Sequence, residues 1–383
     1  MKVKLIYADA MSYNNLQEYD DSLLTNMKTI EKKVFFNSKY NGVMLNQKYV
    51  KKIYNYSDKK GLIKILSYIK SQIKLFRIIK KNSKYNIVHV QWFKIPQLDY
   101  IFIKFLKNMT KVKIVHTAHN VLPHDTGKKY FHIYNKIYKE LDGIIVHTNN
   151  TKEEIIDKFN IAESKINVIP HGILNLRCNQ QKFSKIANEY KEKYKGNEEL
   201  VFLFIGQIRE NKGIDLLCEA WAEEQELYNN SNLRLIIAGN AKGCNYDFNK
   251  IKQCKNVTLD LKFLPEDEFK AYVDIADVIV MPYREISQSG VLLSMIKERK
   301  CVLVSDVGGL ADPFKYGKIG WILKENSKIE LQNNILKIAK NKDEVNKILL
   351  DTKTWEYLND TVYNWAIIGK NTEKFYNKIL ENK

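Results

Sequence analysis

The feature that most constrains this fold is a regular alternation between two kinds of segment. Short apolar runs rich in β-branched residues recur along the chain, and a stretch long enough for a helix follows most of them. The runs occupy residues 2–9, 32–37, 86–92, 113–120, 143–149 and 166–172, and then 201–206, 233–239, 257–264, 276–283 and 300–306. Strands that alternate with helices form parallel sheets covered on both faces. Two such series in tandem predict an α/β chain with two doubly wound domains.

The length and a polar stretch near residue 180 divide the chain. With 383 residues, the chain is long enough for two ordinary domains. A polar, charged stretch over residues 175–199 precedes the strand-like run that opens at Leu200. We therefore expect an N-terminal domain over residues 1–180 and a C-terminal domain over residues 181–354. Residues 355–383 predict helices with aromatic anchors, which could pack on either domain or cross back to the first.

Two absences predict a cytoplasmic protein. The sequence has no run of 18 or more apolar residues, and it opens with a strand-like run instead of a signal peptide. Its five cysteines show no spacing typical of disulfides or zinc sites, so we expect buried, reduced thiols.

The positive charge is concentrated in the first half of the chain. Residues 1–180 contain 31 Lys+Arg and 14 Asp+Glu, a difference of +17, whereas residues 181–383 contain 31 and 30, a difference of +1. This asymmetry predicts that the first half faces an anionic partner: nucleic acid, an acidic lipid surface or a phosphorylated substrate. Nucleic acid is disfavoured because the sequence has no zinc-finger spacing, recognition-helix pattern or aromatic RNA-binding signature.

One segment of this basic half has an amphipathic pattern. An apolar stripe and a cationic stripe run side by side along residues 62–84. The apolar stripe comprises Leu62, Leu66, Ile69, Ile73, Phe76 and Ile79, and the cationic stripe comprises Lys70, Lys74, Arg77, Lys81 and Lys84. A basic amphipathic helix suits an anionic membrane surface. The alternative is a helix packed on its sheet with its lysines in solvent.

The histidines cluster in the sequence without a metal-binding pattern. Six of the seven lie between His89 and His147. His89, His116 and His147 lie in or beside apolar strand runs, which favours hydrogen-bonded core histidines, and no HxH or HExxH spacing occurs. We therefore expect no metal site.

The stretch FIGQIRENKG, residues 204–213, combines two glycines with two cations directly after a strand-like run. In doubly wound folds, ligands bind at the carboxyl ends of the strands. Gly206 and Gly213 permit a tight backbone there, and the next helix begins within the motif IDLLCEAW. Arg209 and Lys212 beside a helix N-terminus form an anion site suited to a diphosphate. The alternative is a pair of solvated loop charges.

Several motifs in order resemble the family 4 glycosyltransferases. They are NIVHVQW, HTAHNVLPHD, NVIPHGI, FIGQIRENKGIDLLCEAW, LRLIIAGNAKG, DIADVIVMPYREISQSGVLLSM and CVLVSDVGGLADPFKYGKIGWIL. The resemblance runs from about residue 85 to the end of the sequence and is weak before that. It implies the GT-B fold, in which two Rossmann-like domains face a cleft, the first binding the acceptor and the second a nucleotide-sugar donor.

The resemblance also implies roles for residues of the C-terminal domain. Arg209 and Lys212 would hold the donor diphosphate and neutralise the leaving group, so that no metal or other cofactor is required. Gly206 and Gln207 would line the donor site, where many relatives have arginine in place of Gln207.

A second loop, within the motif SQSGVL, would add to this donor site. Ser289, Gly290 and Val291 can offer backbone amides to a phosphate, although a simple helix N-cap by Ser287 or Ser289 explains the serines equally well. The family often has two glutamates, eight residues apart. This chain has Glu285, which could orient the donor sugar, but leucine at position 293, so the ribose contact is in doubt.

A histidine of the N-terminal domain completes the candidate site. His119 ends a strand-like run, and the resemblance implies that it approaches the donor sugar to stabilise charge or orient hydroxyls. Asn120, His124 and Asp125 follow in the same loop. An inverting reaction needs a general base, for which His119, His124 and Asp125 are the candidates. In a retaining reaction, which most of the family catalyse, the departing phosphate itself can take the acceptor's proton.

These observations predict a glycosyltransferase of bacterial surface polysaccharide synthesis. The acceptor would be a glycan or a polyprenyl-diphosphate-linked sugar, and the protein would be cytoplasmic or peripheral on the inner face of the membrane. Two alternatives share the fold and the ligand class: a nucleotide-sugar 2-epimerase and a non-catalytic nucleotide-sugar-binding protein.

Overall fold

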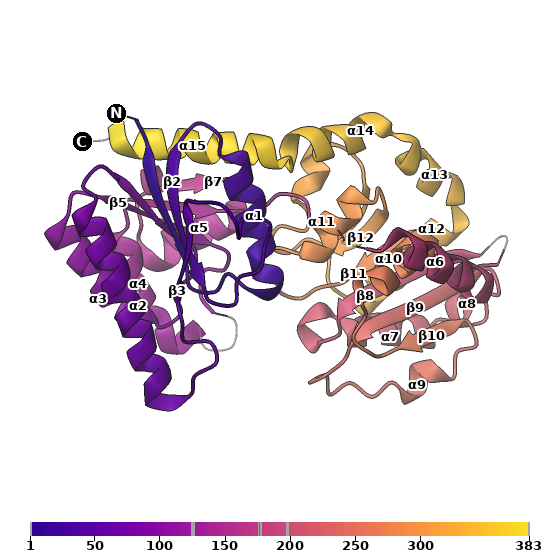
Figure 1. Ribbon diagram of the computed structural model, residues 1–383. Coiled ribbons are helices and arrows are strands. Elements are labelled where there is room, and N and C mark those ends of the chain that lie inside the picture. The colour runs from indigo at the N-terminus through magenta and orange to yellow at the C-terminus, as the bar shows by residue number, and fades with distance from the viewer. Residues whose placement is uncertain (1, 124–126, 175, 177, 197–198, 382–383) are drawn as a thin grey trace. The chain divides into compact units, whose positions relative to one another are not determined.

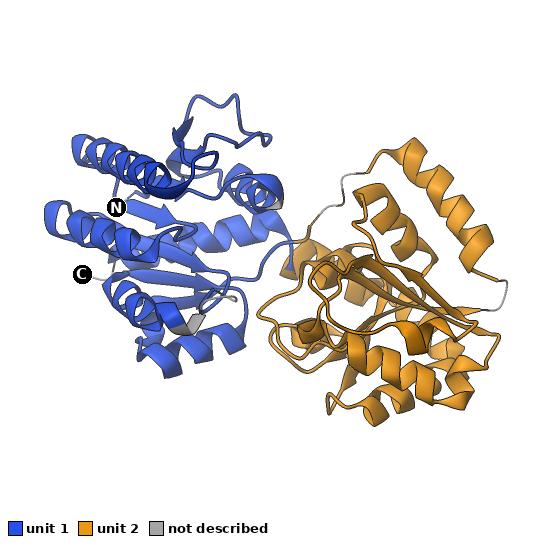
Figure 2. Cartoon of the chain, turned by 90° about the horizontal axis from the view of Figure 1, so that it is seen from below, with its two compact units in different colours: residues 1–172, 363–383 blue, residues 173–362 orange. Residues whose placement is uncertain are grey.

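The chain forms two compact units. The computed structural model describes residues 2–123, 127–174, 176, 178–196 and 199–381. The N-terminal unit comprises residues 1–172 and 363–383, and the C-terminal unit comprises residues 173–362 (Figure 2). The sequence placed these divisions at residues 180 and 354. The first differs because the expected connector contains helix α6 (Gln180–Tyr194), which packs on α10 (Glu266–Ile275) within the C-terminal unit.

The N-terminal unit is built on a seven-stranded parallel sheet (Figure 1). Its strand order is β3-β2-β1-β4-β5-β6-β7. The strands are β1 (Lys4–Asp9), β2 (Glu31–Asn37), β3 (Val50–Tyr54), β4 (Ile87–Val90), β5 (Lys113–Ala118), β6 (Gly143–Val146) and β7 (Ile166–Val168). Strand β3 was not predicted from the sequence, because it is an edge strand whose Lys51 and Lys52 are exposed and break the apolar run.

Helices cover both faces of this sheet. Successive strand residues point to opposite faces, so Leu5 and Tyr7 of β1 join one core and Ile6 and Ala8 join the other. The first core receives α1 (Gln17–Asn26) and α15 (Trp365–Glu381). The second receives α2 (Gly61–Lys81), α3 (Pro96–Met109), α4 (Gly127–Glu140) and α5 (Asn149–Phe159). Single 3-10 turns form at Asn14–Leu16 and Glu163–Lys165. The C-terminal helix α15 is therefore part of the N-terminal unit.

The C-terminal unit has a six-stranded parallel sheet in the order β10-β9-β8-β11-β12-β13. The strands are β8 (Leu200–Gln207), β9 (Leu233–Asn240), β10 (Val257–Asp260), β11 (Val278–Met281), β12 (Cys301–Ser305) and β13 (Gly320–Leu323). Besides α6 and α10, the helices are α7 (Ile214–Glu223), α8 (Gln225–Tyr228), α9 (Asn249–Lys252), α11 (Gly290–Lys297), α12 (Lys328–Lys340), α13 (Lys342–Leu350) and α14 (Thr352–Tyr357). Turns of 3-10 helix form at Glu210–Lys212 and Asp312–Tyr316, and a π-helical turn at Leu358–Val362. Strand β13, a short edge strand, was also missed.

Candidate functional site

The loop between β8 and α7 depends on its two glycines. Gly206 and Gly213 both have positive φ angles, 115° and 67°. A Cβ atom on Gly213 would lie 1.9 Å from the backbone oxygen of Pro282, so no other residue fits without displacing that strand end. The 3-10 turn Glu210–Lys212 lies between the glycines and ends directly before α7. The sequence therefore forms a tight turn that presents Arg209 and Lys212 at the carboxyl end of the central strand.

Lys212 is a poorly solvated cation. Its ammonium lies 4.0 Å from the centroid of the Tyr283 ring, and the side chain is half-buried. Burial, and to a smaller extent the neighbouring Arg209, lower the pKa of Lys212 from 10.5 to about 8. Neither Lys212 nor the exposed Arg209 forms an ion pair with a carboxylate in the described part of the chain. An anion bound beside Lys212 would relieve this electrostatic cost.

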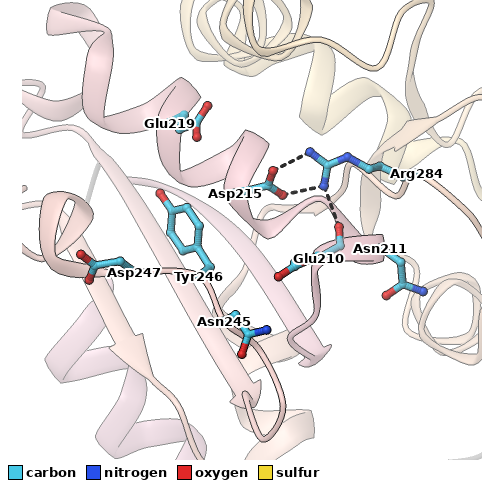
Figure 3. A pocket seen from close by; sticks show the side chains of 8 residues that line it. All are labelled: Glu210, Asn211, Asp215, Glu219, Asn245, Tyr246, Asp247 and Arg284. Carbon is cyan, nitrogen blue, oxygen red and sulfur yellow. Dashed lines mark hydrogen bonds and ion pairs between the residues drawn. The ribbon is translucent and has the colours of Figure 1, made fainter.

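Arg284 anchors the 3-10 turn that contains Lys212, because its side chain hydrogen-bonds both Glu210 and Asp215 (Figure 3). Its guanidinium donates two hydrogen bonds to Asp215 of α7, from Nη1 to Oδ1 at 2.6 Å and from Nη2 to Oδ2 at 2.5 Å. Nη1 also donates to the backbone oxygen of Glu210 at 2.6 Å, and the Arg284 amide donates to that of Asn211 at 3.0 Å. Arg284, which follows β11, therefore links the 3-10 turn Glu210–Lys212 to the first turn of α7.

The loop between β11 and α11 meets the β8 end. Ser289 caps α11, because its Oγ accepts a hydrogen bond from the Leu292 amide at 3.3 Å. A Cβ atom on Gly206 would lie 3.4 Å from Cγ2 of Val291, which places the start of α11 against the glycine that ends β8. The loop after β12 also packs here, since the Gly309 amide donates to the Ser287 oxygen. The predicted glycines, Ser289, Val291 and Lys212 therefore share one edge of the sheet.

A neighbouring hollow of about 500 Å³ has the opposite electrostatic character (Figure 3). Its lining consists of Glu210, Asn211, Asp215, Glu219, Asn245, Tyr246, Asp247 and Arg284. Four of these eight side chains are carboxylates, and Arg284 is already paired with one of them. A diphosphate would be repelled from this hollow, so we place the anion site beside Arg209 and Lys212 instead.

In the N-terminal unit, His119 is held by a chain of hydrogen bonds. His147 Nδ1 contacts the backbone oxygen of Ile169 at 2.9 Å, and its Nε2 lies 3.2 Å from His119 Nδ1. His119 Nε2 then lies 2.5 Å from the amide nitrogen of Gln91. Because a carbonyl oxygen only accepts, His147 must donate from Nδ1 and accept at Nε2. His119 consequently donates from Nδ1 and accepts the Gln91 amide proton at Nε2.

Aromatic rings pack around this chain. The His119 ring stacks on Trp92 with 4.6 Å between centroids and 8° between planes, and Tyr19 contacts His119, His147 and His171 edge-on or tilted. Burial lowers the pKa of His147 to about 3 and of His171 to about 4, and it lowers that of His119 well below the usual value. The cluster is therefore neutral, so His119 does not supply a cation, and both of its ring nitrogens are already hydrogen-bonded.

Three further histidines have the surroundings expected from the sequence: His89, His116 and His147 are buried and hydrogen-bonded. Of the five cysteines, only Cys218 and Cys301 are buried, whereas Cys178, Cys244 and Cys254 are half-buried. Among the described residues, no group of three or more His, Cys, Asp or Glu side chains is arranged to hold a metal ion.

Both halves of the chain match known family models. Residues 46–173 match the model described as Glycosyltransferase Family 4, and residues 186–355 match Glycosyl transferases group 1. The chain is a family 4 glycosyltransferase. Over 324 residues this glycosyltransferase is 26% identical to an uncharacterized glycosyltransferase of Methanocaldococcus jannaschii, which covers 78% of this chain and 77% of that protein.

Solved structures show that the glycosyltransferase has the expected GT-B fold. The structure of Anabaena Alr3699/HepE in complex with UDP and glucose aligns with a TM-score of 0.71 at 12% identity, covering 98% of this chain and 99% of that one. The apo form of the lipopolysaccharide outer core galactosyltransferase WaaB aligns with a TM-score of 0.67 at 14% identity, covering 98% and 100%.

The other residues predicted for the site of this glycosyltransferase differ in position and exposure. Gln207 ends β8 and is exposed, and Gly290 opens α11. Glu285 is exposed and forms no hydrogen bond or ion pair with other described residues. Asn120 is half-buried beside His119, whereas His124 and Asp125 lie outside the described residues. Leu293, where relatives often have the second glutamate, is buried in α11 with 3% exposure and cannot contact a ribose.

Sequence reasoning missed two residues beside His119, Gln91 and Trp92, and two residues beside the turn that contains Lys212, Tyr283 and Arg284. Each follows directly after the strand residues of β4 or β11. The rule that ligand-binding groups gather at the carboxyl ends of parallel strands would have found them.

Proposed function

We propose that this glycosyltransferase moves a sugar from a nucleotide-diphosphate sugar to a glycan or a polyprenyl-diphosphate-linked acceptor in bacterial surface polysaccharide synthesis. We further propose a retaining, metal-independent reaction carried out at the cytoplasmic face of the membrane. The nucleotide-sugar donor is supported by the related fold of HepE, whose structure contains UDP and glucose.

The observation that carries the proposal is the poorly solvated Lys212 at the carboxyl end of β8. Its lowered pKa and its position over Tyr283 describe a cation that is still without an anionic partner among the described residues. A phosphate oxygen supplies that partner, and Arg209 supplies a second positive charge. The amides at the start of α11, behind the Ser289 cap, add partial positive charge for the other phosphate.

In the proposed reaction, the bond between the sugar's anomeric carbon and the diphosphate oxygen breaks, and the electron pair leaves with the nucleoside diphosphate. Lys212 and Arg209 stabilise this developing charge, which replaces the role of a divalent cation. The acceptor hydroxyl attacks the same face of the anomeric carbon, and its proton passes to the departing phosphate oxygen. In this proposal a sugar hydroxyl takes the place of the Gln91 amide at His119 Nε2, so that His119 orients it, and Glu285 is a second sugar contact.

A thermal-shift titration with UDP, GDP, ADP and dTDP tests the donor site. A ligand that binds only the folded protein raises its unfolding temperature. We expect one nucleotide to stabilise the wild type and to lose its effect in Lys212→Ala, while Lys185→Ala, an exposed lysine of α6, behaves as the wild type. Sugar transfer by Lys212→Ala should fall by about 10²–10³-fold. An unchanged nucleotide response in Lys212→Ala would refute the proposed phosphate site.

Product analysis separates the two alternative functions. An epimerised nucleotide sugar formed without any acceptor would identify a 2-epimerase. Nucleotide-sugar binding without turnover, even on membrane extracts, would identify a binding protein, the reading that the buried Leu293 favours.

A further inference from the structure

Helix α2 leaves half of its apolar stripe exposed. Its packed face consists of Tyr68, Ser71, Gln72, Leu75 and Ile79. This face is partly polar because Asp99 of α3 accepts hydrogen bonds from the Tyr68 hydroxyl at 2.5 Å and from the Gln72 amide at 2.9 Å. Of the stripe expected from the sequence, only Ile79 is fully buried. Phe76 and Ile69 are half-buried, and Phe76 packs against the core, whereas Leu62, Leu66 and Ile73 are exposed.

The exposed apolar side chains continue from α2 onto α3. The two helices pack side by side (Figure 1), and the rings of Phe76 and Phe105 meet edge to face at 6.4 Å. We call the exposed side chains on both sides of this contact the apolar ridge. It comprises Leu62, Ile65, Leu66 and Ile73 on α2 and Ile101, Phe105 and Met109 on α3, with exposures from 41% to 68%. A continuous exposed apolar surface of this kind marks a binding face.

The chain around the apolar ridge is almost free of negative charge. Residues 59–124 contain 14 Lys+Arg and one acidic residue, Asp99, which is buried. Lys70, Lys74, Arg77 and Lys104 are exposed and form no ion pair with any described carboxylate. Burial, and to a smaller extent the positive charge of Lys64 in the first turn of α2, lower the pKa of Lys94, which lies just before α3.

We propose that the apolar ridge and its flanking cations dock this protein on a bilayer that contains anionic lipid. Aliphatic side chains enter the boundary between headgroups and acyl chains, and the lysines meet the lipid phosphates. This proposal rests on the proposed function in one respect: it places a lipid-linked acceptor within reach. No described helix is long and apolar enough to span a membrane, so attachment by this face would be peripheral.

Other occupants fit the ridge less well. If a second copy of the protein bound through the same face, the unpaired cations of the two copies would repel one another, because no carboxylate lies between them. Single-stranded nucleic acid binds through stacked aromatic rings, whereas six of the seven ridge side chains are aliphatic or thioether.

Vesicle co-sedimentation tests the docking. The wild type should bind phosphatidylcholine vesicles that contain phosphatidylglycerol and should bind pure phosphatidylcholine vesicles much more weakly. Lys74→Glu with Arg77→Glu should weaken this binding by about thirtyfold or more. Leu62→Glu with Leu66→Glu should weaken it by at least about tenfold. Matched controls are Lys185→Glu with Lys191→Glu on α6 and Ile329→Glu on α12, which should bind as the wild type.

Each other outcome overturns the docking. Equal binding to both vesicle types, unchanged binding by the ridge variants, a ridge-dependent shift to dimers, or ridge-dependent RNA binding without vesicle binding would each reject it. The nucleotide titration is run on the same proteins. Vesicle binding without a nucleotide response would leave the docking standing and reject the proposed donor site. A nucleotide response without vesicle binding would reject the docking, and with it the membrane location of the proposed function, and leave the donor site standing.

Discussion

The ammonium of Lys212 lies over the face of the Tyr283 ring, 4.0 Å from its centroid. Lys212 ends the 3-10 turn after β8, and Tyr283 follows β11, so the pair joins two loops at one edge of the sheet. The ring attracts the cation without neutralising it. An approaching phosphate therefore meets a positive charge that is already positioned.

Replacing the ring should weaken nucleotide binding. Tyr283→Leu removes the cation–π contact, and we expect a loss of about threefold to thirtyfold in affinity for the nucleotide that stabilises the wild type. Tyr283→Phe keeps the ring face and should bind almost as the wild type. Isothermal titration calorimetry measures both, and equal affinities for the Leu and Phe variants would contradict the role of the ring.

Nucleotide affinity should fall as the pH rises above about 8. The free protein loses the Lys212 proton near its pKa of about 8, whereas a bound diphosphate raises that pKa because an adjacent anion favours the ammonium. Below that pH the ammonium is present in both states. Above it, binding takes up a proton, so affinity declines by up to about tenfold per pH unit. Lys212→Arg stays charged and should abolish this decline in a calorimetric pH series.

The same pKa predicts the pH dependence of stability without ligand. The pKa of Lys212 is lower in the folded protein than in the unfolded chain, so between the two values the unfolded chain binds more protons. The free energy of unfolding should therefore rise from about pH 8 to pH 10 relative to that of Lys212→Met. Urea unfolding at several pH values measures the difference, and parallel curves for the two proteins would contradict it.

Arg284 should act on nucleotide binding through the turn that it fastens. Arg284→Met removes the side-chain hydrogen bonds to the Glu210 oxygen and to Asp215 and should lower nucleotide affinity by about tenfold, because Lys212 loses its fixed position. The control is Arg234→Met, which breaks an equally bidentate pair with Glu199 elsewhere in the same unit. Both variants should lose about 1 kcal/mol or less of stability from the ion pair itself. Equal affinities in the two variants would reject the positioning role.

The hydrogen-bond chain through His147 fixes the tautomer of His119. We expect a neutral ring with its proton on Nδ1 at pH 6 to 7, which nitrogen-15 correlation spectra of the imidazoles can distinguish from the other tautomer. Gln91→Leu frees Nε2 and should leave the Nδ1 proton in place, whereas His147→Phe should remove the preference. A proton on Nε2 in the wild type would disprove the assignment.

Restoring the second glutamate of the family should not improve the donor site. Leu293 is buried in α11, so Leu293→Glu places a carboxylate in the core and should cost several kcal/mol of stability. Leu293→Met keeps the volume and should be nearly neutral. Thermal unfolding measures both, and a Leu293→Glu protein that binds nucleotide more tightly without loss of stability would show that this position reaches the ligand.

The donor loop could be predicted from the sequence because its signal is local. A strand, Gly206, two cations and Gly213 lie within ten residues, and a tight turn at the strand end follows directly from them. The pairing of Arg284 with Asp215 could not be predicted in this way, because the two residues are 69 positions apart and only the folded chain brings them together. The sequence also did not show which face of α2 is packed. On that face Tyr68 and Gln72 donate hydrogen bonds to the buried Asp99, and a search for apolar periodicity does not detect such polar contacts.

The contribution of α15 to the N-terminal unit has a consequence for synthesis on the ribosome. Phe375 and Tyr376 fill the core beneath β1, β4 and β5, the Tyr376 hydroxyl lies 2.6 Å from His89 Nδ1, and Glu373 accepts hydrogen bonds from Thr29. All 190 residues from 173 to 362 are translated between the two parts of this unit. At about 5–20 residues per second, the nascent N-terminal sheet waits on the order of ten seconds or more with one face covered only in part, by α1. The first half of the protein to be made is therefore the last to complete its core, and its exposed sheet face is what a nascent-chain chaperone would meet.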